Sequence, residues 1–174
     1  MDALLLPNFF QALKRALDPN IASTELIAEA VECVRRLSFG SGNEVILEDM
    51  SEFLVSPLVE ATVARGVETR EGALEVLMVL TERKESVQAQ VGAVRHCIKR
   101  LVALLAGGLV SRIEQKIAKF AACVLSNISL VPANKPKLLP YEVELAMVAA
   151  SNSGVAKVVC EVLHEISEFQ VFRQ

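Results

Sequence analysis

The stretch Ala121-Ala-Cys-Val-Leu-Ser-Asn-Ile-Ser129 decides the fold, because the chain contains four copies of its pattern. Each copy has apolar residues at its first, fourth, fifth and eighth positions, and Ser or Thr at its ninth. Offsets of three, four and seven residues place these apolar side chains on one face of a helix. The copies are AVECVRRLS (30–38), ALEVLMVLT (73–81), AACVLSNIS (121–129) and VCEVLHEIS (159–167). The pattern therefore predicts four helices with equivalent buried faces.

The spacing of the copies indicates how these helices are arranged. The copies end at residues 38, 81, 129 and 167, so the steps between them are 43, 48 and 38 residues. Periods of this size are typical of armadillo and HEAT arrays, in which each helical unit buries its apolar face against its neighbours. We therefore expect an all-α fold, an armadillo-like helical-repeat solenoid. It would form a right-handed superhelix of about four repeats and occupy residues 1–174 as a single domain.

Polar residues at a fixed distance after the copies support the repeat. Asn43 and Asn134 each follow the ninth residue of a copy by five positions, and Ser86 holds the equivalent place after the second copy. Asn and Ser are good N-caps, because their side chains accept hydrogen bonds from the first N–H groups of a helix. The sequence therefore predicts that a new helix begins at each of them.

The remaining boundaries follow from caps, glycines and prolines. We expect a first helix over about 9–17 capped by Asn8, and a second from Ser23 or Thr24 to a left-handed Gly40. Three prolines between 132 and 140 predict a non-helical stretch. The other expected helices cover about 43–50, 56–66, 70–83, 86–91, 93–106, 113–129, 141–150 and the fourth copy, followed by a cap or tail over 168–174. A separate segment is expected to start at Ser51, between the first two of these helices.

Composition excludes several classes of function. Apolar residues make up 52% of the 174 residues, aromatic residues 5%, and the net charge is −3. An acidic chain has no overall attraction to nucleic acid or to acidic membranes. The longest stretch without a charged residue, Phe120–Asn134, is too short and too polar for a bilayer span. Leu4–Leu6 has no basic flank and is too short for a signal peptide.

Neither a metal site nor a catalytic site is indicated. The four cysteines, at 33, 97, 123 and 160, show no paired C-x-x-C spacing, and scattered cysteines of this kind favour reduced intracellular thiols. His96 and Cys97 are neighbours on an expected helix, where adjacent side chains do not face each other. Gly107-Gly108 lacks the strand and the Lys-Ser/Thr of a phosphate loop. We therefore expect no enzyme activity, metal or cofactor.

A basic tract runs from Arg83 to Lys119. It contains eight Lys or Arg residues against two glutamates, at 85 and 114. Clustered cations can bind phosphates, but no aromatic residue is interleaved for base stacking. Three interpretations are open: a solvated surface, a site for an acidic protein, or a nucleic-acid site.

The candidate partner-binding residues are the sixth and seventh positions of the four copies. In an armadillo array the repeated helix lines the concave surface, and these positions lie outside its buried face. They are Arg35 and Arg36, Met78 and Val79, Ser126 and Asn127, and His164 and Glu165. Peptide-binding armadillo proteins resemble one another in a repeated Asn at the seventh position, and here only Asn127 matches. A fixed partner therefore fits better than a regular peptide ladder, and the alternative is partly buried helix surface.

Three stretches resemble a more specific family. They are Leu37-Ser-Phe-Gly-Ser-Gly-Asn43, Arg70-Glu-Gly-Ala-Leu-Glu-Val-Leu77, and Val155-Ala-Lys-Val-Val-Cys-Glu-Val-Leu163 with Ile166 after it, and the opening Leu5-Leu-Pro7 is similar as well. Together they resemble the carboxy-terminal armadillo-like domain of the large ARID-bearing subunit of BAF-type SWI/SNF chromatin remodellers. The ARID DNA-binding domain is absent from this sequence, so we expect no direct nucleic-acid contact.

The resemblance implies a function. The chain would be a non-enzymatic scaffold in the nucleus, the core-binding domain that helps to hold a SWI/SNF complex together. Its partners would be other remodeller subunits, including a helical segment of the ATPase subunit, with no membrane and no small-molecule substrate. Two rival functions stay open: an independent cytoplasmic armadillo adaptor for peptides, and a nucleic-acid-binding helical repeat that uses residues 83–119.

Overall fold

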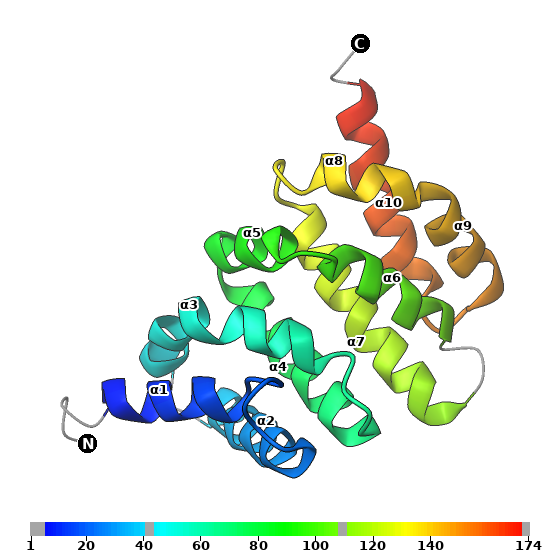
Figure 1. The fold of residues 1–174 in the computed structure, drawn as a ribbon. Coiled ribbons are helices and arrows are strands. Elements are labelled where there is room, and N and C mark those ends of the chain that lie inside the picture. Colours follow the sequence, from blue (N-terminus) through cyan, green and yellow to red (C-terminus); the bar gives the residue numbers. More distant parts are fainter. Residues whose placement is uncertain (1–5, 41–43, 108–110, 172–174) are drawn as a thin grey trace. The chain divides into compact units, whose positions relative to one another are not determined.

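A computed structural model describes residues 6–40, 44–107 and 111–171, and every regular element within these ranges is helical. The all-α prediction is therefore confirmed. In chain order the helices are α1 (Leu6–Ala16), α2 (Thr24–Phe39), α3 (Glu44–Ala61), α4 (Val67–Arg83), α5 (Glu85–Ala93), α6 (Cys97–Gly107), α7 (Arg112–Ser129), α8 (Lys135–Leu138), the 3-10 helix η1 (Leu139–Tyr141), α9 (Glu142–Ser151) and α10 (Ala156–Val171) (Figure 1).

The helices form two compact units, and the boundary between them falls between Leu80 and Thr81, in the last turn of α4. In the first unit α1, α2 and α3 pack against one another. Gly72 of α4 lies against α2, because a Cβ at this position would be 2.9 Å from Val31 Cγ1. A side chain at residue 72 would therefore push α2 and α4 apart.

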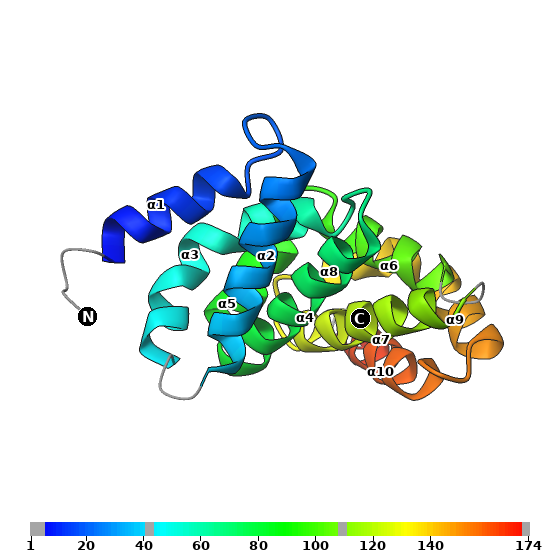
Figure 2. The same cartoon turned by 90° about the horizontal axis from the view of Figure 1, so that it is seen from below.

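In the second unit α7 is the central helix. It packs against α5, α6 and α10, and α10 also packs against α8 and α9. Figure 2 shows α7 and α10 side by side. The core of this unit is aliphatic, and α7 contributes Ile117, Val124, Leu125 and Ile128, each at most 2% exposed. The third copy of the repeat therefore forms the centre of the second unit.

The prediction of separate elements starting at Asn43, Ser51 and Ser56 is wrong. One helix, α3, runs from Glu44 to Ala61 through Ser51 and Pro57. A proline inside a helix removes one backbone hydrogen bond and costs about 3 kcal/mol. Here the neighbouring Leu54, Val55, Leu58 and Val59 are at most 2% exposed. Burial of one such side chain contributes about 1.5–3 kcal/mol, so the set outweighs the proline penalty.

Only some of the predicted caps are confirmed. Ser23 caps α2, because its Oγ accepts from the Leu26 N–H at 3.2 Å. Asn8 lies inside α1, Ser86 lies inside α5, and Asn43 is outside the described residues. Ser111 is an unpredicted cap of α7, since its Oγ accepts from the Glu114 N–H at 3.2 Å. Gly40 ends α2 in an extended conformation with φ −72°, not in the predicted left-handed one.

Three more boundaries differ from the predictions. Gly92 lies within α5, and α6 begins at Cys97, not at residue 93. The proline-rich stretch is partly helical, since α8 and η1 contain Pro136 and Pro140 near their first positions, where a missing N–H is tolerated. The expected tail is helical as far as Val171, because α10 continues past the fourth copy.

Candidate functional site

The four copies keep one register in the structure. Of the sixteen residues at their first, fourth, fifth and eighth positions, all but Cys33, Leu37 and Leu163 are buried, and those three are half-buried. The ninth residue makes a recurring hydrogen bond: the hydroxyls of Ser38, Ser129 and Ser167 donate to the carbonyl oxygens three residues earlier, at 2.7–2.8 Å. Those carbonyls belong to the sixth position of the first, third and fourth copies, so in these three copies the sixth position presents its side chain, and not its carbonyl, to a partner.

Arg35 and Arg36 belong to a charge cluster on α2. Glu32 accepts from Arg35 Nε at 2.7 Å and from Arg36 Nε at 2.7 Å, and Arg35 Nη1 lies 3.4 Å from Glu75 Oε2 on α4. The hydrogen bond from Arg35, and then that from Arg36, lowers the pKa of Glu32 to about 2. A surface hollow of about 410 Å³ lies beside the cluster and is lined by both arginines, Phe39, Gly40 and Glu75. Arg36 is the freer cation, since its side chain is 78% exposed against 37% for Arg35.

This cluster should give the protein a pH-dependent stability. The folded-state pKa of Glu32 lies below the ordinary value of 4.5, so the pairing stabilises the folded state above about pH 4.5. That contribution should disappear as the pH falls from 4.5 toward 2. Thermal unfolding of Glu32→Gln should accordingly differ from wild type near neutrality and converge with it in this acidic window. A carbon NMR titration should find the Glu32 midpoint near 2, and Arg35→Gln should raise it; a midpoint near 4.5 would show that the pairs do not persist in solution.

Met78 and Val79 contribute more to the interior of the first unit than to its surface. Val79 is 8% exposed and Met78 is half-buried. A side chain that is this deeply buried offers little area to a partner. Of the two, only Met78 remains available for partial contact.

The Asn127 side chain forms a hydrogen bond within the second unit. Its Nδ2 donates to Thr81 Oγ1, the ninth residue of the second copy, at 3.0 Å. Asn127 and its neighbour Ser126 are both half-buried. The amide that would bind a peptide backbone in the repeated-Asn arrangement thus already has a partner.

His164 and Glu165 differ in availability. The His164 side chain is 66% exposed, with Nε2 3.5 Å from Glu168 Oε1. Glu165 accepts from Lys135 Nζ at 2.6 Å, and the two side chains are 25% and 13% exposed. This half-buried ion pair joins α8 to α10. His164 is therefore the outward-facing member of the fourth pair.

The structure brings Arg35 and Arg36 together with Glu75 in the first unit, and Asn127 with Thr81 in the second. Alignment of all four pairs along one concave strip stays a prediction.

The role of Asn134 differs from the predicted cap. It is fully buried at the N-cap position of α8, but its side chain makes no capping bond. Instead, Nδ2 donates to the carbonyl oxygens of Gln88, at 3.1 Å, and Ile128, at 3.0 Å. Gln88 Nε2 in turn donates to the Thr81 carbonyl at 2.7 Å. This buried network joins the end of α4, α5 and α7, and a sequence pattern that finds caps does not reveal it.

Sequence reasoning also missed an exposed apolar face on α9. Val143 is 70% exposed and Met147, one turn later, is 60% exposed. Ala146 and Ala150 are exposed on the same helix, whereas Leu145 and Val148 are buried. The available signal was that residues 143–150 are apolar on both faces of the helix, apart from Glu144.

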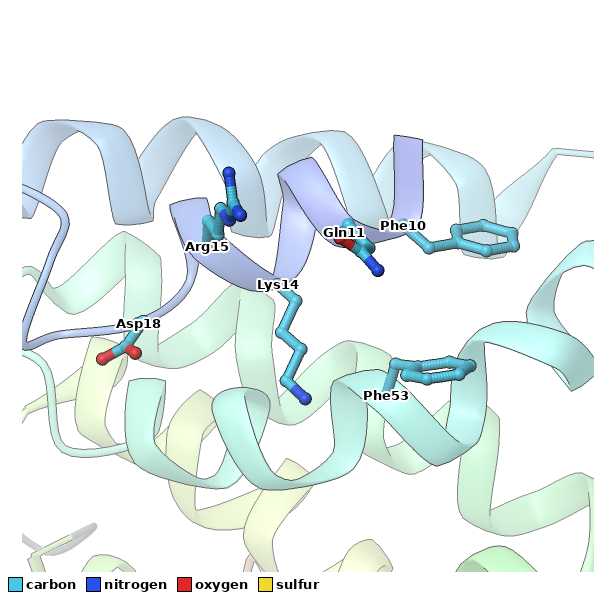
Figure 3. Close-up of a pocket in the computed structure, with 6 residues that line it drawn as sticks. All are labelled: Phe10, Gln11, Lys14, Arg15, Asp18 and Phe53. Carbon is cyan, nitrogen blue, oxygen red and sulfur yellow. The ribbon is translucent and has the colours of Figure 1, made fainter. Parts of the chain in front are cut away.

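The structure also contains a slot of about 560 Å³ between α1 and α3 in the first unit. In Figure 3, Phe10 of α1 and Phe53 of α3 lie one above the other at one end of this slot, and the Lys14 side chain extends between the two helices. The described residues that line it are Phe10, Gln11, Lys14, Arg15, Asp18 and Phe53. Lys14 and Phe10 are four residues apart and therefore share a face of α1. This face becomes one wall of a slot only because α3 packs against α1.

The basic tract belongs to the second unit. Its cations lie at the end of α4, in the turn before α6, and on α6 and α7, and all are exposed except Lys84 and Arg100, which are half-buried. Lys116 Nζ lies 5.8 Å from the centre of the Phe120 ring. Charge alone marks this surface, so the three interpretations of the tract stay open.

His96 and Cys97 lie in different environments, and the Cys123 thiol is held in its protonated form. Cys97 is 1% exposed whereas the adjacent His96 is exposed, and His96 adopts a left-handed backbone with φ 63°. Burial, and then the neighbouring Glu82 and Glu161, raises the pKa of the Cys123 thiol, which favours the unreactive protonated form. Within the described ranges no group of three His, Cys, Asp or Glu residues could hold a metal ion, and no helix is long and apolar enough to cross a membrane.

Comparison with known proteins found no match: no protein-family model matches the chain, and no curated protein matches it.

Proposed function

We propose that this protein is a non-enzymatic protein-interaction scaffold, built as an armadillo-like solenoid of about four repeats in a right-handed superhelix. The observation that supports the repeat is the common register of the four copies. Their equivalent apolar positions are buried or half-buried, and three of them repeat the same hydroxyl-to-carbonyl hydrogen bond. A helical unit whose buried face recurs in this way is suited to stacking on copies of itself.

Exposed apolar surface supports a protein partner. Val143 and Met147 of α9 lie one turn apart and are more than half exposed. Apolar side chains grouped on one helix face are typical of protein-protein contact sites, and methionine adapts well to helical partners. Such a face has little to offer a phosphate backbone. A helical segment of another protein, with its own apolar stripe, would cover it.

By resemblance, the scaffold would be the core-binding domain of a SWI/SNF chromatin remodeller subunit in the nucleus. Its partners would be remodeller subunits, including a helical segment of the ATPase subunit. Capture of these subunits from nuclear extract by the tagged protein, identified by mass spectrometry, tests this proposal. Recovery of cytoplasmic peptide-bearing proteins instead would favour the rival adaptor. Salt-dependent binding to duplex DNA, lost on neutralising the 83–119 tract, would favour the nucleic-acid rival.

Reversal of Arg35 and Arg36 to Glu should abolish assembly into the remodeller. Arg36 is an exposed cation beside a surface hollow, and arginine is frequent among interface hot spots. The readout is co-purification with the other subunits, and duplex DNA binding should change little.

Arg35 also pairs with Glu75, so the double variant needs a check of its fold. Arg36→Glu alone avoids this difficulty, because Arg36 pairs with Glu32 on its own helix. Arg65→Glu is the matched control, since Arg65 is exposed elsewhere in the same unit. Normal co-purification of a folded double variant would place the docking surface elsewhere, for instance on the 83–119 tract.

A further inference from the structure

The slot between α1 and α3 has an apolar end. Phe10 and Phe53 come from different helices, and Figure 3 shows their rings facing each other across the slot. Phe53 is 47% exposed and Phe10 is half-buried. Two phenyl rings held in this way leave apolar area open to water, and a third large apolar side chain between them would remove that area.

A cation lies beside this apolar end. The side chain of Lys14 extends from α1 toward α3 between the phenylalanines and Asp18 (Figure 3). Lys14 and Arg15 form no ion pair among the residues that the structure describes. Asp18 is occupied locally, because its Oδ1 accepts from the backbone N–H of Asn20 at 2.9 Å and from Asn20 Nδ2 at 3.0 Å. Among the described lining residues, the two cations Lys14 and Arg15 thus stand against the single carboxylate of Asp18, next to exposed aromatic surface.

This combination restricts the chemistry of an occupant. Duplex nucleic acid would satisfy Lys14 with its phosphates, but its bases are stacked within the duplex and cannot insert between Phe10 and Phe53. A single-stranded nucleic acid, whose bases stack on aromatic rings, is the competing occupant that the experiment below tests. A purely apolar segment would cover the rings and leave the lysine without a counter-charge. An acidic segment with a large apolar side chain satisfies both, and complementary charge would fix its orientation. The volume of about 560 Å³ is within the range of ligand pockets and holds only a few side chains.

We propose that the slot lined by Phe10, Lys14 and Phe53 is a binding site for a short acidic peptide segment of a partner protein. An aromatic or leucine side chain of that segment inserts between the two phenylalanines, and a neighbouring carboxylate pairs with Lys14. This inference rests on the proposed function as an interaction scaffold. It adds a second contact surface and states the chemistry of what binds there.

The test uses the full chain and a synthetic probe. The probe is a fluorescein-labelled peptide of about ten residues, in which a central phenylalanine is flanked by glutamates. Fluorescence anisotropy at an ionic strength of about 0.15 M keeps exposed charges screened. We expect saturable binding that is weakened about tenfold or more by Lys14→Glu and also by Phe53→Ala. Replacing the central phenylalanine of the probe by alanine should weaken binding to a similar extent.

Matched controls separate the slot from general effects. Lys157→Glu makes the same change of charge at an exposed position of α10, and Val63→Ala removes an apolar side chain that is 51% exposed elsewhere in the first unit. Both should bind the probe like wild type. Circular dichroism should show all four variants folded, since each altered side chain is exposed.

The inference would be overturned by a lack of saturable binding to wild type, by equal binding of the probe to the slot variants and their controls, or by equal binding of the alanine probe. Equal competition by single-stranded DNA would also overturn it, because it would show that the slot does not prefer an acidic peptide over a nucleic acid. The peptide assay is independent of the remodeller. If the peptide does not bind but co-purification with the remodeller subunits is normal, the slot proposal fails and the proposed function stands. If the peptide binds but the subunits do not co-purify, the proposed function fails and the slot proposal stands.

Discussion

Leu125→Ala is expected to lower the free energy of unfolding by about 2–5 kcal/mol, the range for truncation of a fully buried leucine. Leu125 is the fifth residue of the third copy and is 0% exposed. It lies on α7, which packs against α5, α6 and α10 at the centre of the second unit. The substitution removes apolar contacts and leaves a cavity that three surrounding helices cannot easily collapse to fill. Chemical denaturation followed by circular dichroism measures the effect.

Lys119→Ala is the matched control on the same helix. Lys119 is exposed, and surface substitutions of this kind change stability by about 0.5 kcal/mol or less. If Leu125→Ala shifted the unfolding midpoint no more than Lys119→Ala, the inward face of α7 would be misassigned. The equivalent positions in the other copies would then need revision as well.

Asn134→Ala should cost about 1–3 kcal/mol, because it removes two buried hydrogen bonds that contribute about 0.5–1.5 kcal/mol each. The acceptors of these bonds are the carbonyl oxygens of Gln88 and Ile128. Asn127→Ala is the comparison: Asn127 is half-buried and donates to a single hydroxyl, so about 1 kcal/mol is expected. Equal losses in denaturation experiments would show that the Asn134 network contributes nothing beyond an ordinary hydrogen bond.

Gly92 provides an independent check on the same network. In a helix, alanine is normally about 1 kcal/mol more favourable than glycine. A Cβ at residue 92, however, would be 2.5 Å from Asn134 Nδ2, and two hydrogen bonds hold that side chain in place. Gly92→Ala should therefore destabilise the wild-type protein.

The same substitution in the Asn134→Ala background should be neutral or stabilising, since the obstructing amide is gone. The difference between the two backgrounds is a coupling energy that unfolding experiments measure directly. Additive effects of the two substitutions would show that residue 92 and the Asn134 side chain do not meet.

The sequence by itself determined the secondary-structure class and the inward face of the repeated helices. A period of 3.6 residues is a local property, and burial of one helix face is the main requirement that a soluble helix must meet. For this reason the sequence pattern alone assigns the apolar positions of the third copy, including Leu125, to the core. The local sequence also predicts the end of α2 near Gly40 and the end of α4 at Arg83, because glycine and basic residues are common at helix C-termini.

Only the tertiary structure decided where a residue departs from its local conformational preference, and where a side chain has a different role from the one that its local sequence predicts. Pro57 stays inside α3 because neighbouring side chains are buried, and burial depends on helices that are distant in sequence. Asn134 has the chemistry of a cap but donates its amide to two buried carbonyls, one of them in α5. Val79, a candidate partner contact by its place in the repeat, is buried instead.

The same reason applies to the slot between α1 and α3. Phe10 and Phe53 are 43 residues apart in the sequence, and no local pattern relates them. Their proximity, and the position of Lys14 beside them, depends on how two helices pack. Periodicity indicates which face of each helix turns inward, but it carries no information about which other helix that face will meet. Contacts between helices are set by the summed packing of many side chains, and these contacts form the cavities and buried networks of this protein.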